Sequence, residues 1–159
     1  MIPREIVQPM IEPISRKLYK TSAPRSYLDT SGILANKPTL ISIAEGFEYD
    51  GASVPQIAWT LTGLTPDGLM RYPSLPHDWI YEQKGRIRVL VGNTHAVLKV
   101  SHKNCDKLFL HMLKEQEAWF VWAYKNGLDA EYGGLEPWRI RLAYTAVRVG
   151  GGFMWKPWE

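Results

Sequence analysis

Short runs in which apolar and polar residues alternate occupy the first third of the chain. Residues 14–19 and 39–47 are β-favouring and alternate in this way, which is typical of strands with one buried face. Turn formers such as Asp29 and Gly32 lie between the two runs. The prolines of residues 1–13 exclude a helix there and predict an extended N-terminal arm. The pattern predicts a small antiparallel sheet preceded by an arm.

Helical periodicity dominates the second half. Pro76 just before the stretch 77–83 predicts a helix start there, with Gly85 ending the helix. Apolar residues recur at helical spacing in a segment that Ser101 can cap and that runs to about residue 116. A further helical pattern covers 137–149 and stops at Gly150. Between the first two helices, Val89–Asn93 predicts an extended excursion.

These elements predict an α+β fold, with a small N-terminal antiparallel β-sheet followed by a C-terminal bundle of about three helices. No repeat or low-complexity linker divides the chain, so we expect one domain over 1–159. Its ends are an extended arm, 1–13, and a tail, 150–159, hinged at the glycine triplet. The aromatic residues of that tail, Trp155 and Trp158, either dock back on the core or contact a partner.

Composition and charge exclude several classes of protein. The chain has 159 residues, of which 45% are hydrophobic and 22% charged, as in globular domains. The net charge is only +3, and the basic run 84–88 is too short to form the basic stripe of a nucleic-acid-binding protein. We therefore do not expect nucleic acid as a partner. No stretch has the ~18 apolar residues of a transmembrane segment, and the N-terminus lacks the core of a signal peptide. We expect synthesis in a cytoplasm.

Candidate chemistry gathers around His77. On a helix, His77 and Tyr81 share a face because they are four residues apart, and Asp78 points to a neighbouring sector. Asp106, near the start of the next helix, can supply a second carboxylate. Such a set can activate water, with His77 as the general base and Asp106 fixing its tautomer. The alternative is that the same side chains form a hydrogen-bonded structural network.

A divalent cation is a second possibility for this region. Asp78 and Asp50 are the candidate metal ligands, with calcium expected ahead of zinc. The loop 46–55 that carries Asp50 either binds a cation or is a tight connection that satisfies its own backbone. The single cysteine, Cys105, excludes an intramolecular disulfide, and a buried core residue is the favoured reading over a nucleophilic thiol paired with His102.

Four ordered motifs resemble a family of bacteriophage and prophage proteins without an assigned activity. In that family a GF-x-x-D-x-ASVP loop is followed by an HDW-x-Y helix, an Asp-x-x-Phe helix and an AVR-x-G segment. The matching residues here are Gly46, Phe47, Asp50, Ala52, Ser53, Val54, Pro55, His77, Asp78, Tyr81, Asp106, Phe109, Ala146, Val147, Arg148 and Gly150. This chain departs from the pattern in a longer insertion, 84–100, and in its N-terminal arm. The resemblance implies a phage origin and a role in the virion, in lysis or in handling the host.

A looser resemblance is to secretory phospholipases, in which a His-Asp-x-x-Tyr helix pairs with an aspartate on an antiparallel helix. It implies His77 as base, Asp78 as calcium ligand, and Tyr81 with Asp106 as support. The chain departs from those enzymes in lacking disulfides and a clear glycine-rich calcium loop.

Two functional hypotheses follow. The first is a hydrolase acting on host envelope lipid or cell wall. The second is a non-enzymatic virion or tail protein, with other virion proteins as partners and the two chain ends as contacts.

Overall fold

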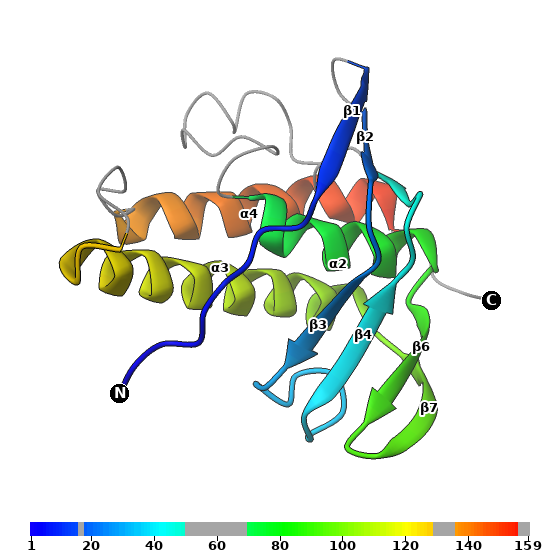
Figure 1. Cartoon of the computed structure of the whole chain (residues 1–159). Helices are drawn as coiled ribbons and strands as arrows, with labels where there is room; N and C mark the ends of the chain where they lie inside the picture. The colour runs from blue at the N-terminus through cyan, green and yellow to red at the C-terminus, as the bar shows by residue number, and fades with distance from the viewer. Residues whose placement is uncertain (16–17, 50–69, 129–135, 156–159) are drawn as a thin grey trace.

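The computed structural model describes residues 1–15, 18–49, 70–128 and 136–155, and it has the predicted α+β class (Figure 1). Two antiparallel sheets are present: a three-stranded sheet ordered β1-β2-β5 and a four-stranded sheet ordered β3-β4-β6-β7. The strands are β1 (Ile11–Ser15), β2 (Leu18–Thr21), β3 (Arg25–Asp29), β4 (Thr39–Ile43), β5 (Glu48–Tyr49), β6 (Arg86–Val91) and β7 (Thr94–Lys99). The helices are α2 (Arg71–Glu82), α3 (His102–Lys125) and α4 (Pro137–Met154).

The four-stranded sheet packs one face against the helices. Alternate residues of three of its strands point inward, with Tyr27 on β3, Ile41 on β4 and Ile87 on β6 all buried. This alternation is the period of two that a half-buried sheet requires. These side chains form one core cluster with Leu75 of α2 and Leu108 of α3. A second cluster joins α3 to α4, which lies behind α2 in Figure 1.

Several strands differ from the sequence prediction. The run 14–19 is not one strand, because β1 ends at Ser15 and β2 begins at Leu18. The run 39–47 is β4 followed by a turn that leads into β5. The turn-rich region between them contains β3, which its polar residues concealed. The excursion around Val89 is confirmed as the β6–β7 hairpin, in which Val91 pairs with Thr94.

The helix boundaries also differ. α2 begins at Arg71 and contains Pro76, so the predicted start at His77 is wrong. Residues before Pro76, such as Tyr72 and Leu75, are buried in the core, and this packing outweighs the hydrogen bond that proline cannot make. Ser101 does cap α3, its hydroxyl accepting from the Asn104 amide, but the helix continues to Lys125.

The glycine triplet is not a hinge, since α4 runs through it to Met154. Gly151 is buried, and a β-carbon there would overlap the Tyr81 hydroxyl. Close packing against α2 therefore explains a glycine inside this helix better than flexibility does. Trp155 follows the helix and packs on Tyr81.

The N-terminal residues before β1 are docked on the domain. Ile6 is buried in the main core cluster. Arg4 donates to the Tyr72 hydroxyl at 2.6 Å, and the Gln8 amide donates to Gln116 at 3.1 Å. Figure 1 shows this segment crossing α3. The arm is thus part of the folded surface. Within the ranges described, no helix combines the length and apolarity needed to cross a bilayer.

Candidate functional site

Two antiparallel helices bring the candidate residues together. Tyr81 lies against His102, and His77 lies against Asp106, so the chain direction of α2 opposes that of α3. Tyr81 follows His77 by one turn, and their ring centroids are 4.3 Å apart. Phe109 also contacts the imidazole, edge-on, with ring centroids 5.4 Å apart. These two aromatic contacts restrict the orientation of the His77 ring.

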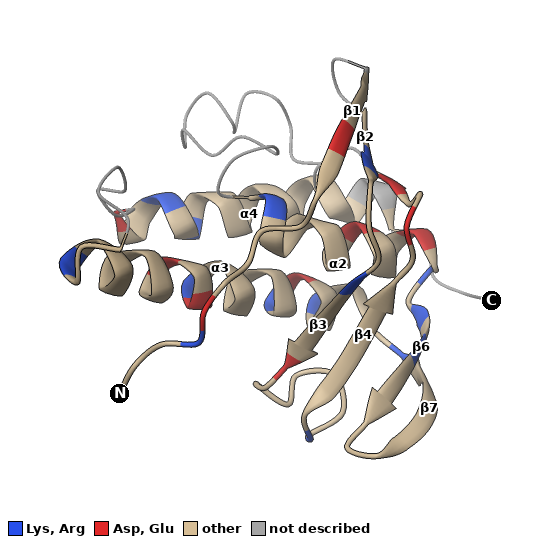
Figure 2. Ribbon diagram, viewed as in Figure 1, with Lys and Arg blue, Asp and Glu red and all other residues tan. Residues whose placement is uncertain are grey.

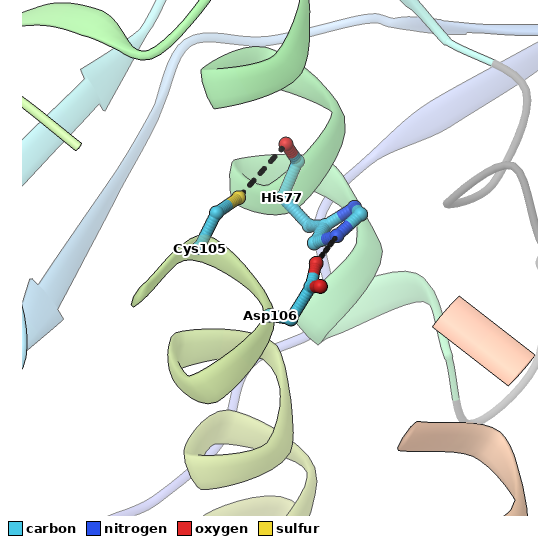
Figure 3. Close-up of side chains that lie close together, drawn as sticks. All are labelled: His77, Cys105 and Asp106. Carbon is cyan, nitrogen blue, oxygen red and sulfur yellow. Dashed lines mark hydrogen bonds and ion pairs between the residues drawn. The ribbon is translucent and has the colours of Figure 1, made fainter. Parts of the chain in front are cut away.

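Asp106 is the centre of the site, and it has no exposed surface. Its Oδ1 lies 2.9 Å from Nε2 of His77 and accepts the Tyr81 hydroxyl at 3.0 Å. Its Oδ2 accepts from Nη1 of Arg148 on α4 at 2.7 Å. Figure 3 shows the carboxylate of Asp106 facing the His77 ring from the neighbouring helix. One buried carboxylate therefore links α2, α3 and α4.

The charge of Asp106 is compensated where it is buried. Burial alone would raise the pKa of this carboxyl, but hydrogen bonds from His77 and Arg148 and the charge of His77 lower it below its ordinary value. The hydrogen bond to Asp106 in turn raises the pKa of Arg148. Asp106 is therefore an anion at neutral pH.

His77 faces a carboxylate from each ring nitrogen. It is 1% exposed, and its Nδ1 lies 3.2 Å from Oδ1 of Asp78. Burial lowers the pKa of His77, but the hydrogen bonds and charges of Asp106 and Asp78 outweigh burial, so the net pKa is raised. With these two carboxylates ionised, the protonated ring is favoured.

Three residues of this region were not predicted as parts of the His77 site, and His102 was considered only as a partner of Cys105. Arg148 appears in the sequence prediction only within the AVR-x-G motif. Its position next to Val147, which faces inward, was the available sign that this arginine lies near the core. His102 Nε2 lies 3.0 Å from Oδ2 of Asp106, at an angle that does not make a good hydrogen bond. Trp155 stacks on His102, with ring centroids 5.5 Å apart. Contacts of α4 with two other helices carry no sequence signature.

Cys105 belongs to the core and not to a thiol site. Its Sγ donates to the backbone carbonyl of His77 at 3.7 Å, as Figure 3 shows. Burial raises the pKa of this thiol well above its ordinary value, so it stays protonated. Potential ligand atoms of His77, Cys105 and Asp106 lie within 4.8 Å of one another. In this structure Asp106 accepts hydrogen bonds from His77, Tyr81 and Arg148, so its oxygens belong to a hydrogen-bond network.

The two candidate cation ligands differ in what can be said of them. Asp78 is 8% exposed and lies near Tyr49 at the end of β5, where its charge contributes to the raised pKa of that tyrosine. Asp50 and the rest of the loop 50–55 lie outside the described residues.

Fold and site together define a class: an α+β protein in which three helices share a His–Asp–Tyr–Arg network centred on a buried aspartate. Residues 28–124 match the model of a family described as Protein of unknown function (DUF1353). The chain belongs to this family. The match spans His77, Asp78, Tyr81 and Asp106 and ends before α4. Neither the curated proteins nor the solved structures contain a match to the chain.

Proposed function

We propose that this chain is a phage-associated hydrolase in which His77 is the general base, acting on ester bonds of host envelope lipid or on cell wall. The phage association rests on the four motifs that resemble phage and prophage proteins. One observation carries the chemistry: Nε2 of His77 faces a buried aspartate that is itself held by Tyr81 and Arg148.

The pairing with Asp106 decides which nitrogen of His77 works as the base. Asp106 is an anion and can only accept, so Nε2 carries a proton toward it. The lone pair of neutral His77 is then on Nδ1, which lies on the Asp78 side of the ring. In the proposed step, Nδ1 removes a proton from water while the water oxygen bonds to the substrate carbonyl carbon and the carbonyl oxygen becomes an oxyanion. When the oxyanion collapses, the bond to the leaving group breaks, and the leaving alkoxide or amine takes the proton from Nδ1. Asp106 stabilises the imidazolium that forms.

Asp78 is the proposed cation ligand beside that nitrogen, with Asp50 as a second ligand. The Asp78 carboxylate lies next to Nδ1 of His77 and offers oxygen donors. Such donors suit calcium better than zinc. A divalent cation bound there would offset the charge of Asp78 and polarise the substrate carbonyl. Without that offset, Asp78 favours protonated His77, which is the inactive form of a base.

The test combines melting and activity. Calcium should raise the melting temperature of the wild type and of Glu82→Gln, which removes an exposed carboxylate from the same helix. Asp78→Asn should lose this shift. His77→Gln should remain folded, because its amide can still donate to Asp106, while hydrolysis of short-chain phospholipid or peptidoglycan fragments falls about 100- to 10,000-fold.

A second candidate function is favoured by the burial of His77. A ring that is 1% exposed, with both nitrogens facing carboxylates, also suits a structural network that fixes three helices in a virion or tail protein. On that account the wild type shows no hydrolysis and no response to calcium, and His77→Gln loses only stability. The docked N-terminal residues count against a free arm as the virion contact.

A further inference from the structure

A pocket of about 330 Å³ lies beside the polar network, where α3 begins. Its lining comes from three segments that are far apart in the sequence: the start of β6, the end of β7 with the α3 cap, and the residue after α4. These residues are Lys84, Gly85, Arg86, Lys99, Val100, Ser101, His102 and Trp155. The volume is within the range of small-ligand sites, roughly 300–1,000 Å³.

Backbone contacts hold the walls of this pocket in place. Arg86 of β6 pairs with Lys99 of β7, and the Val100 amide donates to the Gly85 carbonyl at 2.7 Å. Gly85 has a φ of 78°, and a β-carbon there would overlap the Val100 carbonyl and lie 2.9 Å from Cζ2 of Trp155. Only glycine permits this approach. The pocket is therefore built from paired backbone and a packed indole.

The lining combines basic residues with an aromatic side chain. Lys84, Arg86 and Lys99 carry positive charge, and no acidic residue is among the lining residues named. Figure 2 shows basic residues at the start of β6. Ser101 is the N-cap of α3, so the positive end of a 24-residue helix adds to the same potential. Trp155, stacked on His102, supplies a flat apolar wall.

We propose that this pocket binds a phosphate ester, with the phosphate at the basic residues and the organic part against Trp155. A phosphate carries more charge than a carboxylate and accepts hydrogen bonds on several oxygens, which suits a lining with three basic residues. His102 and Tyr81 separate the pocket from the His77 ring, and the lining does not include Asp78. The site is therefore independent of the hydrolase proposal.

Binding of phenyl phosphate to the full chain at low ionic strength tests the proposal by calorimetry. The double variant Lys84→Gln/Lys99→Gln should bind at least about tenfold more weakly than wild type. The matched control is Lys37→Gln/Lys125→Gln, which removes the same charge from exposed positions outside the pocket. It should bind within about twofold of wild type, since distant charges are largely screened.

Trp155 has its own readout. Wild type should prefer phenyl phosphate to inorganic phosphate by about tenfold, and Trp155→Leu should lose this preference while still binding inorganic phosphate. Equal weakening in the two double variants would overturn the proposal, because binding would then follow net charge alone. So would the absence of phenyl phosphate binding at millimolar concentration.

The same variants separate two sources of a phosphate ester. If the natural ligand is a lipid headgroup, the Lys37/Lys125 control should bind phosphatidylglycerol vesicles and the Lys84/Lys99 variant should not. Binding of phenyl phosphate without binding of vesicles supports a free phosphate ester.

Discussion

α3 contacts its neighbours through opposite chemistry at two places along its length. Near its start, buried Asp106 holds His77, Tyr81 and Arg148 through charged hydrogen bonds. Further along, α3 packs on α4 through an apolar cluster: Met70, Phe109, Leu113, Ile140, Ala143 and Val147. The apolar end shows that these helices can associate without charge. Burying charges costs free energy that apolar residues would avoid, so the polar end is where a function is best sought.

Loss of the central carboxylate should have the largest effect. Asp106→Ala leaves buried, protonated His77 and the partly exposed Arg148 without their shared partner. We expect the free energy of unfolding to fall by about 3–5 kcal/mol, the usual cost of breaking a buried ion pair from one side. Urea denaturation measures it. A loss below about 1 kcal/mol would mean that water replaces the lost carboxylate and that the network contributes little to the free energy of unfolding.

Truncating a residue of the apolar cluster should lower the free energy of unfolding nearly as much, for a different reason. Leu113 is fully buried, and Leu113→Ala should cost about 2–5 kcal/mol through lost transfer free energy and a cavity. Its effect should be the same at pH 5 and pH 8, because no titrating group is removed. If the loss from Leu113→Ala changed with pH as the loss from Asp106→Ala does, the polar network and the apolar cluster on α3 would not be energetically separate.

The sequence predicted what local periodicity determines and missed what packing determines. His77 and Tyr81 could be placed on one face because helical geometry fixes residues four apart. Ser101 could be recognised as a cap from its side chain and the apolar pattern that follows. Arg148 could not be placed, since its contact with Asp106 depends on how α4 crosses two other helices.

The two misread helix ends have the same origin. Pro76 and the glycines after Val149 carry strong local signals for the beginning and end of a helix. In the structure, tertiary contacts override both signals: Tyr72 and Leu75 anchor the turns before the proline, and Gly151 packs beneath Tyr81. Local propensity is worth at most a few kcal/mol, and the core exceeds that.

A third prediction uses pH to distinguish the polar network around Asp106 from the apolar cluster, which has no titrating group. The pKa of His77 is raised from its ordinary 6.5, so its contribution to stability is complete below about pH 6.5 and is lost as pH rises through the higher folded value. The pKa of Asp106 is lowered from 3.8, so its contribution is present above about pH 3.8 and is lost as pH falls through the lower folded value. His102, whose pKa is lowered by burial, acts in the opposite sense to His77.

The measurement is the free energy of unfolding between pH 4 and pH 9 in a chelating buffer. Wild type should lose stability as pH rises above about 6.5, and His77→Gln should lose less over the same interval. A parallel decline in both proteins would assign the pH dependence to other groups and would leave His77 neutral in the folded state.

The smallest effect separates two neighbouring glycines of α4. A β-carbon at Gly151 would overlap the Tyr81 hydroxyl and lie 2.9 Å from Nε2 of His102, whereas one at Gly152 would lie 3.9 Å from His102 Cε1, an ordinary contact. Gly152→Ala should therefore stabilise the chain by about 0.5–1 kcal/mol through helix propensity alone. Gly151→Ala gains the same propensity but displaces Tyr81 from Asp106, for a net loss of about 1–3 kcal/mol. Thermal melts of the two variants compare them directly. Stabilisation by both would show that α4 can move away from Tyr81 without cost, and the close contact between α4 and the polar end of α3 would then not be needed.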